Sequence, residues 1–158
     1  MTEQNKTSSK ENLLSVADLK HGQSEQKKIV TSGKRKRAIA KAKITEGVGE
    51  VSINKENYTK LNYLNRLRVE EPLRITKEVL GGLKFNVEIT VHGGGEKGQL
   101  EAVRLALARA ISEFSNSPEL TSAFLKYDRN LLIADVRRKE TYKPGDSKAR
   151  RKRQKSYR

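Results

Sequence analysis

The stretch from residue 83 to residue 114 changes its apolar period once, and this change constrains the fold more than any other feature. Apolar and polar residues alternate strictly from Leu83 to His92, which predicts a strand with one buried face. Glycines follow at positions 93, 94, 95 and 98, and apolar residues then recur at helical spacing as far as Phe114. The stretch therefore predicts a strand, a glycine turn and a helix of about 16 residues, on which the rest of the chain must pack.

Shorter patterns predict the elements on either side of this stretch. Alternation over residues 29–45 indicates one strand, with a short strand over residues 50–54 pairing back onto it as a hairpin. The sequence Glu-Glu-Pro at 70–72 is typical of a helix start, and Gly-Gly at 81–82 is typical of its end. Ser-Pro-Glu at 117–119 predicts the N-cap and first turn of one more helix.

Charged residues on the predicted central helix are spaced to interact with each other. Glu101 lies three residues before Arg104, and Arg109 lies four residues before Glu113. Side chains at these separations are neighbours on a helix surface. We therefore expect two ion pairs on the exposed side of the helix.

The charge balance points to a polyanionic partner. The chain has 34 Lys and Arg against 19 Asp and Glu, a net charge of +15, which favours nucleic acid first and an anionic membrane second. The last 25 residues hold eleven of these cations, three acids and few large apolar residues, so burial cannot offset the entropy of ordering them. We expect a mobile N-terminal extension over residues 1–28, a globular α+β domain over 29–133 and a basic extended tail over 134–158.

The chain lacks the residues that several classes of protein need for their function. Without cysteine the chain has no disulfide and no thiolate metal site, and His21 and His92 are far apart, which argues against a histidine-based metal cluster. No apolar run approaches the ~20 residues that span a membrane. The sequence also lacks a nucleophile elbow and paired catalytic acids. We therefore predict neither an enzyme nor a membrane protein, and expect no cofactor and no metal.

The glycine turn allows three interpretations. Gly93, Gly95 and Gly98 match the pattern G-x-G-x-x-G between a strand and a helix, which would suit a nucleotide-binding enzyme, but no acid ends a second parallel strand some twenty residues on. The glycines can instead serve only the tight turn. In the third interpretation, the turn's amides and the helix N-terminus hold a nucleic-acid phosphate beside Lys97.

A general binder of single-stranded nucleic acid is a further alternative. Such proteins stack bases on aromatic side chains. This chain has three Phe and five Tyr, several of them at apolar-patterned positions, so few are available for stacking.

Separated motifs resemble one known family. Residues 93–111, with Gly-Gly-Gly, Gly-Gln and Ala-Arg-Ala-Ile, resemble the signature of the universal small-subunit ribosomal protein S-nine family. The sequence Ser-Gly-Lys-Arg-Lys at 32–36 resembles the family's opening strand, and Glu-Pro-Leu at 71–73 its next helix start. Downstream, Asp-x-Arg at 135–137 and Lys-Ala-Arg-Arg at 148–151 resemble its tail. The ending at 154–158 is similar to the archaeal and eukaryotic cytosolic type.

The resemblance implies a fold and a role. The fold would be an α+β domain like the second domain of ribosomal protein S-five, a sheet with helices packed on one side, followed by a long extended tail. The protein would be a structural constituent of the small ribosomal subunit in the cytoplasm, without homo-oligomers. It would bind the rRNA of the subunit head beside neighbouring ribosomal proteins, and its tail would reach the P-site tRNA.

The candidate site residues are mostly cationic. Those expected to contact rRNA are Lys34, Arg35, Lys36, Arg37, Lys97, Arg137, Arg138, Lys139, Lys143, Lys148, Arg150, Arg151, Lys152 and Arg153. Those expected to contact tRNA form the tip of the tail: Lys155, Ser156, Tyr157 and Arg158. The tip ends in Arg158, whose planar fork suits phosphate oxygens, and Tyr157 could stack on a base or pack against the tail.

Overall fold

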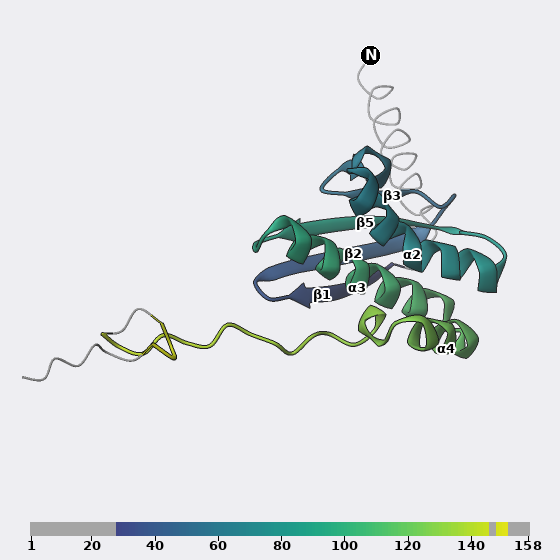
Figure 1. Cartoon of the computed structure of the whole chain (residues 1–158). Coiled ribbons are helices and arrows are strands. Elements are labelled where there is room, and N and C mark those ends of the chain that lie inside the picture. Colours follow the sequence, from purple (N-terminus) through teal and green to yellow (C-terminus); the bar gives the residue numbers. More distant parts are fainter. Residues whose placement is uncertain (1–27, 146–147, 152–158) are drawn as a thin grey trace, which may run out of the picture.

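The computed structural model describes residues 28–145 and 148–151 (Figure 1). Within them, five strands form one mixed sheet in the order β1-β2-β5-β3-β4, and three α-helices pack on one side of it. This arrangement confirms the predicted α+β class. The strands are β1 (Ile29–Arg35), β2 (Ala38–Glu46), β3 (Val51–Ile53), β4 (Glu56–Asn57) and β5 (Phe85–His92). The helices are α2 (Tyr63–Leu80), α3 (Glu96–Ser115) and α4 (Pro118–Tyr127), with 3-10 turns at Tyr58–Lys60 and Arg129–Leu131.

The predicted strand, glycine turn and helix are confirmed as β5, residues 93–95 and α3. The apolar face of β5 is buried and its polar face is largely exposed, and α3 lies across β1 and β2. At 20 residues α3 is longer than predicted. Gly93 and Gly94 have φ angles of 75° and 68°, which other residues rarely adopt, and a Cβ on Gly94 would lie 2.9 Å from the Ala38 nitrogen. The turn therefore depends on its glycines.

The prediction of one strand over residues 29–45 was wrong, because this segment is a hairpin. Lys36 and Arg37 form a tight turn, with Lys36 at a φ of 54°, and β1 pairs antiparallel with β2. Buried positions are odd-numbered in β1 (Thr31, Gly33) and even-numbered in β2. In a continuous strand, all residues on the buried face are either odd-numbered or even-numbered. The change from odd to even between β1 and β2 is therefore the sign of the turn. The turn was missed because it contains neither glycine nor proline.

The predicted hairpin between residues 50–54 and the first strand was also wrong. β3 pairs parallel with β5, and antiparallel with β4. Parallel neighbours need a crossover connection, and α2 supplies it here. Asn86 of β5 holds the preceding loop, because its Oδ1 accepts hydrogen bonds from the amides of residues 48, 49 and 50 at 2.9–3.2 Å. A strand as short as β3 carries a pattern of only three residues, and this pattern does not indicate with which other strand it pairs.

Helix α2 begins seven residues earlier than predicted. Its first residue is Tyr63, so Pro72 lies inside the helix and not in its first turn. A proline costs an interior helix about 3 kcal/mol in isolation. Here the proline ring is buried on the same face of the helix as Val69 and Leu73. Tertiary packing of this face therefore outweighs the low helix propensity of proline. The predicted end is confirmed, since Gly81 caps the helix at a φ of 73°.

The start of α4 is confirmed as well. The Ser117 hydroxyl accepts a hydrogen bond from the Leu120 amide at 3.4 Å, and Pro118 is the first helical residue. The fully buried Leu120 and Phe124 join α4 to the core between the sheet and the helices. In the described part of the chain, no helix has the length and apolar character needed to cross a membrane.

The two ion pairs predicted within α3 do not form as pairs of that helix. Glu101 is paired with Arg68 of α2 at 2.9 Å. Arg104 contacts Glu71 of α2 at 2.5 Å and Asp128, after α4, at 2.9 Å. Charged residues of α3 thus tie the helices to one another, which spacing within a single helix cannot reveal.

Candidate nucleic-acid interface

The first group of predicted cations occupies the end of β1 and the β1–β2 turn. Lys34, Lys36 and Arg37 are exposed, whereas the Arg35 side chain is only 23% exposed. The antiparallel register pairs Arg35 with Ala38 and leaves the two turn residues projecting beyond the sheet. The hairpin therefore presents three of these four consecutive cations to solvent, and Arg35 is mostly covered.

An open hollow is bordered by both the β1–β2 turn and the glycine turn. This glycine hollow has a volume of about 670 Å³ and is lined by Arg35, Lys36, Arg37, Arg68, Gly94, Gly95, Glu96, Lys97, Gly98 and Glu101. No side chain caps the N-terminus of α3, whose N-cap is Gly95. Lys97 lies beside the glycine turn in this hollow, as the third interpretation of the glycines requires, and the structure also brings it to the cations of the β1–β2 turn. It adds Arg68, which the sequence analysis did not select.

The acids of the glycine hollow are engaged by neighbouring side chains. Glu96 accepts a hydrogen bond from Asn65 at 2.6 Å, and Glu101 is paired with Arg68. Gln99 donates a hydrogen bond to the Gly93 carbonyl at 3.1 Å and so braces the glycine turn. The backbone of the turn is thus held from α3, whereas α2 binds the two acids.

A second hollow also borders the β1–β2 turn. This tail hollow has a volume of about 770 Å³ and is lined by Lys36, Arg37, Arg137, Arg138, Lys139, Glu140, Thr141 and Tyr142. The Lys139 ammonium donates a hydrogen bond to the Tyr142 hydroxyl and lowers the pKa of that phenol, with the nearby Arg37 charge acting in the same direction. Lys36 and Arg37 therefore border both hollows.

The chain after α4 is attached to the domain in successive steps. Leu131 is fully buried in the core. The Arg109 guanidinium then donates one hydrogen bond to the Leu132 carbonyl at 2.9 Å and another to the Ser32 carbonyl of β1 at 3.0 Å. Arg109 was predicted to pair with Glu113, but it ties the start of the C-terminal segment to β1. No sequence pattern connects residues that are 77 positions apart, as Ser32 and Arg109 are.

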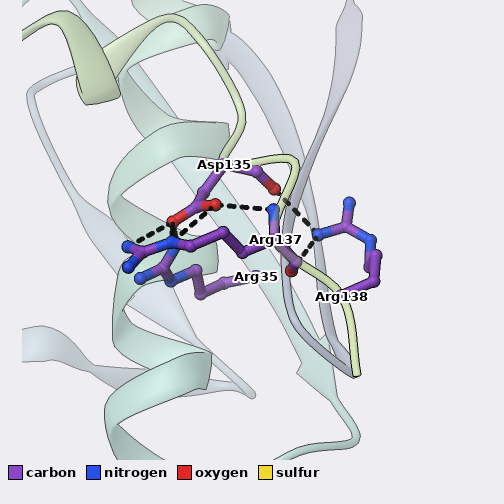
Figure 2. Close-up of polar contacts among 4 residues, drawn as sticks. All are labelled: Arg35, Asp135, Arg137 and Arg138. Atoms are coloured by element: carbon purple, nitrogen blue, oxygen red, sulfur yellow. Dashed lines mark hydrogen bonds and ion pairs between the residues drawn. The ribbon is translucent and has the colours of Figure 1, made fainter. Parts of the chain in front are cut away.

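Asp135 makes the next attachment (Figure 2). Its carboxylate forms ion pairs with Arg35 of β1 and with Arg137, whose Nη2 lies 2.7 Å from Oδ2. The Arg137 amide donates to Oδ1 at 2.7 Å. Arg138 donates from Nη1 to the carbonyls of residues 135 and 137 at 2.8 and 3.1 Å. The three arginines were predicted as RNA contacts, whereas no contact was predicted for the aspartate.

The other predicted site residues lie farther along the tail. Lys143, Lys148, Arg150 and Arg151 are exposed, and Arg150 is paired with Glu140 at 2.8 Å. Lys152, Arg153 and the predicted tRNA contacts at 155–158 lie outside the described residues. Among the residues that the structure describes, His, Asp and Glu side chains form no group of three or more that could hold a metal ion.

Comparison with known proteins places the chain in a family. The family model for ribosomal protein S9/S16 matches residues 33–158. A small ribosomal subunit protein uS9 of Methanococcus vannielii is 43% identical over 136 residues, which cover 84% of this chain and 99% of that protein. A protein of the same name from Desulfurococcus amylolyticus is 43% identical over 131 residues, covering 82% of this chain and 92% of its own length.

The chain, an α+β domain followed by a basic extension, thus matches a class of ribosomal proteins. These proteins are structural components and not enzymes. The chain belongs to the ribosomal protein S9/S16 family. This result confirms the resemblance drawn from the sequence motifs, and the archaeal relatives agree with the predicted archaeal or eukaryotic type of ending. It also removes the alternative of a nucleotide-binding enzyme that would use residues 93–98.

Proposed function

We propose that the chain binds the rRNA of the small-subunit head through the β1–β2 turn and the two hollows beside it, within cytoplasmic ribosomes. The observation that carries this proposal is a convergence: cations from residues 35–37, 97 and 137–139 border one pair of adjoining hollows. These groups are separated by some sixty and forty positions in the sequence. If these cations only made the protein soluble, they would not need to lie close together in the structure.

The shape of this surface suits a folded RNA. Contacts to phosphates position a protein on nucleic acid, and arginine forks match phosphate oxygens. Lys36 and Arg37 border both hollows, so the turn can contact RNA backbone in each of them. The uncapped N-terminus of α3 beside Lys97 offers amide donors to a phosphate in the glycine hollow. Neighbouring ribosomal proteins of the head would border the remaining surface, with no homo-oligomer formed.

Crosslinking inside assembled small subunits tests the rRNA interface. After ultraviolet irradiation, we expect RNA-linked peptides from residues 34–37 and 137–142 by mass spectrometry. Lys41 and Lys43 serve as an internal control, because they are exposed lysines on the face of β2 that is not covered by helices. If crosslinks came from these lysines and not from the turn and the tail, the proposed interface would be wrong.

The P-site tRNA contact is a separate proposal for Lys155, Ser156, Tyr157 and Arg158. It is supported by the family resemblance of this ending and by the extended course of the described tail, which leads away from the domain (Figure 1). A charged hydrogen bond between the Arg158 fork and a phosphate, with Tyr157 against a base or ribose, would hold tRNA at the limit of the tail's reach.

Deletion of residues 155–158 is expected to speed dissociation of P-site tRNA about tenfold, since charged hydrogen bonds are worth about 1.5–3 kcal/mol. Incorporation of the protein into subunits should stay nearly unchanged. The matched control replaces Lys152 and Arg153 with serine, which removes one lysine and one arginine upstream of the tip, as the deletion does at the tip itself. Equal tRNA dissociation rates with the deleted and the full-length tail would show that the tip is one more rRNA anchor.

A further inference from the structure

We infer that Asp135 is a positioning residue that fixes the direction in which the basic tail leaves the domain, and its use in RNA binding rests on the function proposed above. The structure gives Asp135 an environment unlike that of the other described tail acid. Its side chain is 15% exposed and its carboxylate contacts two guanidinium groups, one from β1 and one from the tail. Glu140 is 57% exposed and contacts a single arginine.

The contacts of Asp135 define the path of the next three residues. The Arg35 pair fixes the carboxylate to the end of β1, and the Arg137 amide turns back onto the same carboxylate. The Arg138 guanidinium then bridges the carbonyls of residues 135 and 137. These contacts form a compact polar latch at the base of the tail. Its members restrain both the side chains and the backbone.

Electrostatics explains why a latch of this kind is needed. The β1–β2 turn and the tail are both strongly cationic, so without a bound polyanion they repel each other where they border the tail hollow. Val136 is 86% exposed and Arg137 is 78% exposed, so apolar burial does not hold this part of the tail. A carboxylate placed between the two segments converts their repulsion into an attachment.

A fixed exit direction favours binding of RNA. A tail that starts in one direction presents its cations at a higher effective concentration to the RNA beside the β1–β2 turn than a tail that samples all directions. The latch therefore predicts that removing the Asp135 charge weakens RNA binding. Bulk electrostatics predicts the opposite, because the loss of a negative charge makes the tail more cationic.

The first test measures the latch in the free full-length protein. The chain contains no cysteine, so spin labels at Thr141→Cys and Lys77→Cys, both exposed positions, report the distance from the tail to α2. We expect a narrow distance distribution in the parent and a broad one in Asp135→Asn. The exchanged pair Arg35→Asp with Asp135→Arg again places one carboxylate among arginines and should restore a narrow distribution. A distribution that stays narrow in Asp135→Asn would overturn the inference.

The second test compares two variants of equal charge. Asp135→Asn is expected to bind the rRNA of the subunit head about five- to tenfold more weakly. Glu140→Gln removes one negative charge from the same tail, at the border of the tail hollow, and should bind more tightly because less negative charge opposes the RNA phosphates. If both variants bound more tightly, Asp135 would act through bulk charge alone. If the parent did not bind this rRNA, the proposed function would fail, while the distance distributions would still decide whether the latch exists.

Discussion

Deletion of residues 134–158 is expected to weaken binding to small-subunit rRNA by on the order of a hundredfold or more at moderate salt. The deleted segment carries eleven Lys and Arg against three acids, and three of these cations border the tail hollow. Each phosphate contact that the deletion removes should lower the slope of log affinity against log salt by about 0.7–0.9. The affinity and its salt dependence should therefore fall together.

The same deletion should leave the melting transition of the domain almost unchanged. The cut lies beyond the fully buried Leu131 and beyond the Leu132 carbonyl that Arg109 binds. The deletion does remove the largely buried ion pair between Asp135 and Arg35, but it also opens Arg35 to water, so no charge is left buried and unpaired and the domain should lose little stability. Calorimetry and binding titrations at several salt concentrations provide the two measurements.

Deletion of residues 1–27 is the matched control for the tail. That segment is similar in length and carries four lysines against four acids. We expect it to change RNA affinity little, because it contributes no net cation. Two results would contradict the prediction: RNA affinity that survives the tail deletion, or a domain that unfolds without its tail. The second result would move the domain boundary beyond residue 133.

Gly33→Ala is expected to destabilise the domain by about 3 kcal/mol, a large share of the roughly 5–15 kcal/mol that holds a typical domain folded. A Cβ at this position would lie 2.2 Å from the Ala102 carbonyl oxygen and 2.7 Å from the Ala106 nitrogen. Both atoms belong to the backbone of α3, so neither can rotate away. The close approach also lets the buried Thr31 hydroxyl donate to the Ala106 carbonyl at 2.9 Å. Adding one methyl group must push β1 away from the helix.

Gly82→Ala is the matched control for this substitution. A Cβ at Gly82 would meet no atom within 4 Å, and its φ lies outside the left-handed region. Reduced freedom of the unfolded chain should make this variant neutral or more stable by up to about 1 kcal/mol. Chemical denaturation measures both free energies of unfolding. Equal stabilities of the two variants would show that the contact between β1 and α3 relaxes easily.

Much of the fold was determined by local sequence signals. The alternation in β5, the glycine turn and the helical period of α3 predict these elements because burial on one face selects the apolar spacing. The cap at Ser117 and the left-handed Gly81 were also predicted correctly, since each depends on the chemistry of a few adjacent residues. The family, too, follows from the sequence, because several separated motifs occur in the right order along the chain.

Only the tertiary structure decided how these elements meet. The partner of β3, the position of Pro72 inside α2 and the contacts of Arg104 depend on residues far away in the sequence. The same is true of the site, where Lys97, the β1–β2 turn and Arg137 border adjoining hollows. Asp135 shows the difference most clearly: by composition it is one of three acids in a basic tail, and in space it joins that tail to β1. Local patterns encode burial and turns, whereas partners across long separations are selected by packing and charge in the folded chain.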